Sequence, residues 1–128
     1  MKKYRKYSSV FCETGSGNGE GIQAALDAGF EKVYSMDAYA HKFKGVKERF
    51  KNKLCVELFL GDSADVLKSL LSFVLNKRCV LWLDAHWSGA HGEASFDACP
   101  ILRELSVIKE SVVKNHIILI DDIFSTLL

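Results

Sequence analysis

The chain has 128 residues, of which 48% are hydrophobic and 26% are charged, and this length and mixture predict one globular domain over residues 1–128. The 17 Lys and Arg residues nearly balance the 16 Asp and Glu residues, which argues against disorder and against a nucleic-acid-binding surface. No apolar run approaches the roughly 18 residues of a membrane span, and no signal-peptide segment follows the basic first residues. We therefore expect a cytoplasmic protein that binds neither nucleic acid nor membranes.

Strand and helix patterns alternate along the chain. Runs of β-branched, apolar and aromatic residues predict strands at residues 8–13, 32–36, 54–60, 79–84 and 116–122. Apolar residues at helical spacing predict helices at about residues 20–28, 39–51, 61–76 and 100–113. Gly29 is expected to end the first helix, Asp62 or Ser63 to cap the third, and Pro100 to occupy the first turn of the fourth. Gly45 weakens the pattern of the second helix.

This alternation predicts an α/β fold. Five strands separated by four helices favour right-handed crossovers and a Rossmann-like parallel sheet with helices on both faces. The usual nucleotide-fold strand order is 3-2-1-4-5, and we expect it here. The four cysteines contain no C-x-x-C pair, so we expect reduced thiols that act as small apolar residues.

A glycine-rich segment follows the first predicted strand. Glu13 is followed by Gly15, Gly17 and Gly19, and glycines let a backbone approach a ligand at a helix N-terminus. A dinucleotide fingerprint would need glycine at position 20 or 22, where the chain has Glu20 or Ile22. The spacing therefore disfavours a nicotinamide or flavin dinucleotide, and the acidic residue before the glycines suits a ligand with a cationic amine.

An acidic residue followed by G-x-G-x-G resembles the first motif of the class I S-adenosylmethionine (SAM)-dependent methyltransferases. The resemblance extends over nearly all of the chain and implies that Asp37, at the end of the second strand, binds the ribose. It further implies that Asp62 and Ser63, after the third strand, contact the adenine. The cofactor-binding residues implied in this way are Glu13, Gly15, Gly17, Gly19, Asp37, Asp62, Ser63 and Asp84. In the alternative interpretation, the glycines form only a tight turn, and the two aspartates following the second and third strands are solvated caps.

The fourth and fifth predicted strands both end in carboxylates. Asp84 ends the fourth, and Asp121 and Asp122 end the fifth. Neighbouring strands lie about 4.8 Å apart, so these like charges would crowd one edge of the sheet unless a cation or protons neutralise them. A hard divalent ion with oxygen ligands, most simply Mg²⁺, would neutralise these carboxylates. The alternative is that the last two aspartates only end a strand and begin a turn.

This second pattern resembles the metal-dependent small-molecule O-methyltransferases of the macrocin and catechol types. The resemblance implies that Asp84, Asp121 and Asp122 hold the metal and that His86 is the catalytic base that accepts the proton of a substrate hydroxyl. His86 could instead be an ordinary loop histidine, and His91 in the same loop competes for the base role. Trp87 either lines an acceptor pocket or only pins the loop at residues 85–98.

The function predicted from these patterns is metal-assisted O-methylation of a small polar acceptor, such as a sugar or natural-product hydroxyl. One alternative is a non-catalytic SAM-binding domain or truncated remnant, because the family normally continues past the fifth strand with a helix and two more strands. A nucleotide-dependent oxidoreductase is a further alternative, which the glycine spacing disfavours.

The apolar fifth strand predicts an assembly. In the expected order, residues 117–120 form a sheet edge without the proline or inward charge that commonly protects one. The tail at residues 123–128 adds apolar surface. We therefore expect a homo-oligomer that packs this edge and tail against another subunit.

Overall fold

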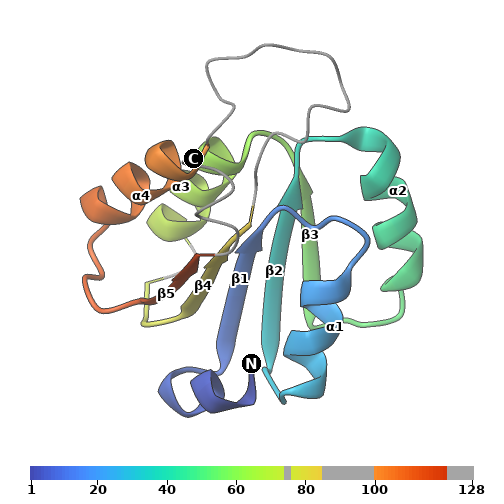
Figure 1. The fold of residues 1–128 in the computed structure, drawn as a ribbon, viewed down its shortest axis with the longest axis horizontal. Coiled ribbons are helices and arrows are strands. Elements are labelled where there is room, and N and C mark those ends of the chain that lie inside the picture. The colour runs from blue at the N-terminus through green and yellow to red at the C-terminus, as the bar shows by residue number, and fades with distance from the viewer. Residues whose placement is uncertain (74–75, 85–99, 121–128) are drawn as a thin grey trace.

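The computed structural model describes residues 1–73, 76–84 and 100–120, and Figure 1 shows them as a twisted sheet with helices on its two faces. The elements in chain order are η1 (Lys2–Tyr7), β1 (Val10–Thr14), α1 (Glu20–Asp27), β2 (Lys32–Asp37), α2 (Ala40–Arg49), β3 (Val56–Leu60), α3 (Ser63–Phe73), β4 (Val80–Leu83), α4 (Ile101–Glu110) and β5 (Ile117–Ile120).

The sheet has the predicted topology. Its strand order is β3-β2-β1-β4-β5, and every neighbouring pair is parallel. The carboxyl ends of the strands therefore meet along one edge, where ligands bind in open α/β sheets. Met36 lies opposite Thr14 and Leu83 lies opposite both Thr14 and Ile120, so the ends of four strands are in register.

Two apolar clusters hold the helices against the two faces of the sheet. Ile22 of α1 and Val46 of α2 pack with Phe11 of β1, whereas Leu67 of α3 and Ile108 of α4 pack on the opposite face. Figure 1 shows the same division, with α1 and α2 on one side and α3 and α4 on the other. Neighbouring residues of one strand serve both clusters because side chains alternate across a sheet.

Within the described residues, the predicted elements are confirmed in type and order, and most of their ends differ by one to three residues. Residues 74, 75, 121 and 122 of the predicted third helix and fifth strand lie outside the described residues. β3 begins at Val56 instead of residue 54, because Leu54 is 93% exposed and lies in the preceding turn. α2 forms despite Gly45 and ends at Arg49. Pro100 occupies the cap position before α4 instead of its first turn. The short 3₁₀ helix η1 was not predicted from the sequence.

Within the described residues, no helix combines the length and apolar character needed to cross a bilayer. Cys12, Cys55 and Cys79 are free thiols in the structure, and Cys99 lies outside the described residues. Burial raises the pKa of Cys12 and that of Cys79, the latter to about 12, so both stay protonated and act as apolar core residues.

Candidate functional site

The glycine loop between β1 and α1 has a backbone that requires glycine. Gly15, Gly17 and Gly19 have φ values of 80°, 55° and 97°, in the left-handed region. A Cβ atom on Gly19 would also lie 2.6 Å from Cε2 of Phe50, the residue that caps α2. The N–H of Gly15 donates to the Met36 carbonyl at 2.8 Å, which folds the loop over the end of β2.

Asp37 lies at the end of β2 and is joined to the glycine loop. Its Oδ2 accepts a hydrogen bond from the N–H of Gly17 at 3.1 Å, and its Oδ1 accepts one from the N–H of Tyr39 at 3.0 Å. The structure therefore brings together two of the predicted cofactor-binding elements, the loop and this acid.

Glu13, the acidic residue of β1, is buried beneath the loop with 3% of its surface exposed. Its Oε1 accepts a hydrogen bond from the Ser35 hydroxyl at 2.7 Å, and Ser35 lies 2.6 Å from the Ser16 hydroxyl of the loop. Burial raises the pKa of Glu13 to about 8, the Ser35 hydrogen bond opposes this rise, and the charges of Asp84 and Asp37 add to it. The carboxylates at the end of β2 and directly after β4 thus act on the buried carboxyl of β1.

Gly21, two residues after Gly19, is a further residue at this site, and no role for it was predicted from the sequence. It lies in the first turn of α1, and a Cβ atom there would collide with Oε2 of Glu13 and lie 3.1 Å from its Cδ. The buried acid therefore occupies the space that a side chain at position 21 would need.

Asp62 and Ser63 follow β3 at the start of α3. They lie beside the end of β2, since the N–H of the preceding residue, Gly61, donates to the Asp37 carbonyl at 2.9 Å. Oδ2 of Asp62 accepts from the N–H of Asp65 at 3.1 Å, which confirms Asp62 as the cap of α3. Its Oδ1 accepts from Arg103 at 3.0 Å. Ser63 is buried and donates its hydroxyl to Glu104.

Asp84 directly follows β4, on the other side of β1. Its backbone N–H donates to the carbonyl oxygen of Thr14 at 3.1 Å and to the Thr14 hydroxyl at 3.0 Å. Leu83 pairs with Ile120, and these are the residues that immediately precede Asp84 and Asp121 in the chain.

The predicted metal site falls largely outside the described residues. Among the residues that the structure describes, no group of three His, Cys, Asp or Glu side chains could hold a metal ion. The residues of this prediction that lie outside them are His86, Trp87, His91, Asp121 and Asp122. The magnesium site and the catalytic base therefore stay predictions.

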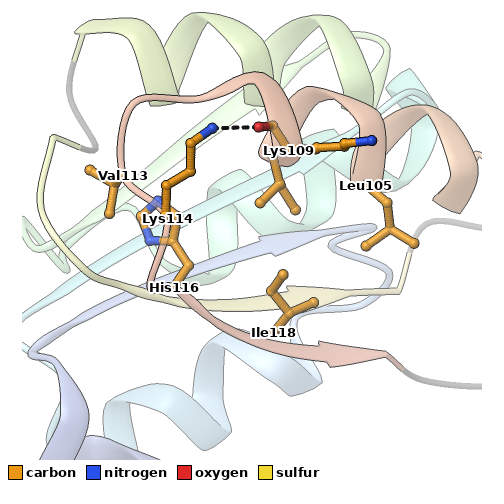
Figure 2. Close-up of a pocket in the computed structure, with 7 residues that line it drawn as sticks. Leu105, Lys109, Val113, Lys114, His116 and Ile118 are labelled. Atoms are coloured by element: carbon orange, nitrogen blue, oxygen red, sulfur yellow. Dashed lines mark hydrogen bonds between the residues drawn. The ribbon is translucent and has the colours of Figure 1, made fainter.

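A separate cavity of about 300 Å³ lies between the end of α4 and the start of β5 (Figure 2). Leu105, Ile108 and Ile118 give it an apolar lining, and Lys114 donates to the Lys109 carbonyl at 2.6 Å beside it. His116 also lines this cavity, and its Nδ1 accepts from the N–H of Cys79, just before β4 begins, at 3.0 Å. The cavity thus lies at the amino end of the sheet, opposite the glycine loop, and is not part of the predicted cofactor site.

No protein-family model matches the chain, and no curated protein matches it in sequence. Solved structures do match it in fold. The methyltransferase PaMTH1 of Podospora anserina, with bound S-adenosylhomocysteine (SAH), has a TM-score of 0.71 and 18% identity over 96% of this chain and 50% of its own. A candidate methyltransferase from Streptococcus mutans in complex with SAH has a TM-score of 0.62 and 18% identity over 88% of this chain and 62% of its own.

A candidate RNA methyltransferase from Pyrococcus horikoshii, PH1948, gives a TM-score of 0.52 and 17% identity over 77% of this chain and 44% of its own. The chain spans about half the length of PaMTH1 and under two thirds of the length of the Streptococcus mutans protein. At these identities the likeness concerns the arrangement of helices and strands. The chain thus has the Rossmann-like fold of the SAM-dependent methyltransferases.

Proposed function

We propose that the protein is a SAM-dependent methyltransferase whose cofactor binds at the carboxyl edge of β1, β2 and β3. The observation that carries this proposal is the buried carboxyl of Glu13 beneath the glycine loop, with Asp37 and Asp84 close enough to raise its pKa. A cluster of like charges favours a cationic ligand, which stabilises the ionised carboxylates. SAM carries a sulfonium and an ammonium group, whereas a dinucleotide carries a pyrophosphate that these acids would repel.

The fold comparison supports the same ligand, since PaMTH1 and the Streptococcus mutans protein both contain SAH. In this chain Asp37 would bind the ribose hydroxyls, and the start of α3 would contact the adenine. Gly17 donates to Asp37, so the loop and the ribose acid would be fixed relative to each other before the cofactor binds. Such preorganisation reduces the ordering cost of binding.

For the reaction itself, the more specific proposal is O-methylation of a small polar acceptor, such as a sugar or natural-product hydroxyl. Asp84, Asp121 and Asp122 supply carboxylate oxygens, which suit Mg²⁺, and Leu83 and Ile120 pair just before Asp84 and Asp121. Mg²⁺ bound there would lower the pKa of the acceptor hydroxyl. His86 would accept the hydroxyl proton, and the glycine loop would hold the methyl donor in line with the acceptor oxygen.

Calorimetric titration of the purified chain with SAM, SAH and NADH, each with and without Mg²⁺, tests this function. We expect SAM and SAH to bind and NADH not to bind. Transfer of a labelled methyl group to hydroxyl acceptors, before and after chelator treatment, then tests the metal. Binding without transfer to any acceptor would favour the non-catalytic domain, and binding of NADH alone would favour the oxidoreductase.

Replacing Asp37 with alanine is expected to weaken SAH binding by about 1.5–3 kcal/mol, because charge-assisted hydrogen bonds to the ribose are lost. Calorimetry measures the loss. Asp27→Ala is the matched control. It removes the same charge from an exposed position at the carboxyl end of α1, the end away from the glycine loop. Unchanged affinity in the Asp37 variant would remove this residue from the site.

The cytoplasmic location and the homo-oligomer stay proposals. β5 is an edge strand of the sheet that the structure describes, and Ile118 is partly exposed on it. An unprotected apolar edge supports pairing with another subunit. The proposed partners are therefore a small-molecule acceptor and a second copy of the chain.

A further inference from the structure

Glu104 is an acidic residue at a position where the helical spacing of apolar residues predicts an apolar side chain. It lies in α4 between Ile101 and Ile108, three residues after one and four before the other, which places it on the buried face of the helix. None of its surface is exposed.

The carboxylate of Glu104 joins two parts of the candidate site. Its Oε1 accepts a hydrogen bond from the Thr14 hydroxyl, at the end of β1, at 3.0 Å. Its Oε2 accepts a hydrogen bond from the Ser63 hydroxyl, at the first residue of α3. Arg103, the preceding residue, bonds to Asp62 at 3.0 Å and so ties α4 to the same end of α3.

The hydrogen bonds of Thr14 also connect Glu104 to the residue that follows β4. The Thr14 hydroxyl accepts a hydrogen bond from the N–H of Asp84 and donates its own proton to Glu104. One buried side chain thus links the residue that follows β4, the end of β1 and the start of α3. These are the segments that hold Asp84, the glycine loop and the predicted adenine contact.

Keeping an acid at this position is costly, which argues that it does more than fill the core. Burial raises the pKa of Glu104 to about 7, although the Ser63 and Thr14 hydrogen bonds oppose the rise. Among charged neighbours, Asp62 adds to the rise and Arg103 reduces it. A leucine would pack on this face of α4 without that desolvation cost, as buried ionic groups replaced by apolar ones often show.

We propose that Glu104 is a positioning residue for the cofactor site: it holds Ser63, at the start of α3, and Thr14, beside Asp84, in one fixed arrangement. This inference rests on the proposed function, because the arrangement matters for a cofactor whose adenine end lies at α3 and whose methyl end lies near β4. Glu104 itself is buried and acts through the two hydroxyl groups that it binds.

The test compares SAH affinity by calorimetry in the wild type, Glu104→Leu, Glu104→Gln and Thr14→Val. We expect the leucine variant to bind SAH at least tenfold more weakly although it is folded, because it can bond to neither hydroxyl. Glutamine keeps an acceptor for Thr14 and offers a donor to Ser63, so it should restore most of the affinity. Thr14→Val should weaken binding, and adding it to Glu104→Leu should cause little further loss, since both break the same link.

Glu110→Gln, an exposed position at the end of the same helix, is the control and should bind as the wild type does. A folded leucine variant with wild-type SAH affinity would overturn the proposal, because an effect on stability alone leaves the folded protein's affinity unchanged. If the leucine variant does not fold, wild-type affinity in Thr14→Val overturns it.

A second readout separates this inference from the proposed function. If the wild type binds neither SAM nor SAH, the proposed function fails, and amide hydrogen exchange of the ligand-free protein still tests the positioning. We then expect Glu104→Leu to speed exchange at Asp84 and Asp65, whose N–H groups bond to Thr14 and Asp62, at least tenfold. The N–H of Val33, bonded to the Cys55 carbonyl at the far end of β2, should not change. Equal rates at Asp84 and Asp65 in both proteins would overturn the inference.

Discussion

Replacing Gly21 with alanine is expected to destabilise the protein by about 1–3 kcal/mol, the usual cost of overpacking a filled core. Glycine to alanine at a helical position ordinarily stabilises by about 0.5–1 kcal/mol, so the sign is reversed here. The reason is the Glu13 carboxyl, which occupies the place of the new methyl group and is held there by Ser35. Urea unfolding followed by circular dichroism measures the change.

Gly45→Ala is the matched control for this prediction. Gly45 lies within α2, and a Cβ atom there would meet no atom within 4 Å apart from those of its chain neighbours and its own helix backbone, so alanine should stabilise the protein. Adding Glu13→Ala to Gly21→Ala should recover stability, because the collision is then removed. Equal stabilisation by the two glycine substitutions would show that Glu13 does not press against α1.

Replacing Glu13 with glutamine is expected to make the protein more stable in alkaline solution, by roughly 3–5 kcal/mol at pH 8.5. The pKa of Glu13 is raised by burial to about 8, so the folded state holds a proton that the unfolded chain releases near pH 4.5. The free energy of unfolding therefore falls as pH rises from about 4.5 to 8. The variant has no carboxyl at position 13, so its free energy of unfolding lacks this contribution to the decrease. Urea unfolding at pH 5 and pH 8.5 measures both ends of this range.

The same substitution should weaken SAM binding at least tenfold at pH 8.5, because it removes a carboxylate that the proposed cationic ligand would stabilise. Glu110→Gln, at an exposed position, should change neither property. A variant that is less stable than the wild type at pH 8.5 would contradict the burial of an unfavourable charge. A more stable variant with unchanged SAM affinity would contradict the proposed role of Glu13 in cofactor binding.

Some of the predicted site residues lie together in the structure, and others lie outside the residues that it describes. The structure brings Glu13, Asp37 and the glycine loop together at the ends of β1 and β2, and it places Asp62 and Ser63 beside them. The metal and base predictions are untested, because Asp121, Asp122 and His86 lie outside the described residues. The likeness to solved structures supports the methyltransferase fold and leaves the acceptor as a proposal.

Two contacts could be anticipated only in part. Glu104 is an acid between Ile101 and Ile108 at helical spacing, a pattern that signals a buried polar residue but not its partners. Its partners Thr14 and Ser63 are 90 and 41 residues away in the chain. Gly21 follows Gly19 at the same two-residue spacing as the glycines before it, but its collision with Glu13 depends on how α1 lies against β1.

The sequence by itself determined the fold class, the order of the elements and the strand ends at which a cofactor would bind. These follow from hydrophobic period, glycine positions and the handedness of parallel crossovers, all of which are local or general. Only the tertiary structure decided which polar groups meet: Asp37 with Gly17, Glu104 with Ser63, and Glu13 with Gly21. The physical reason is that hydrogen bonding and steric exclusion act over a few ångströms, so they depend on packing between segments that are distant in the chain.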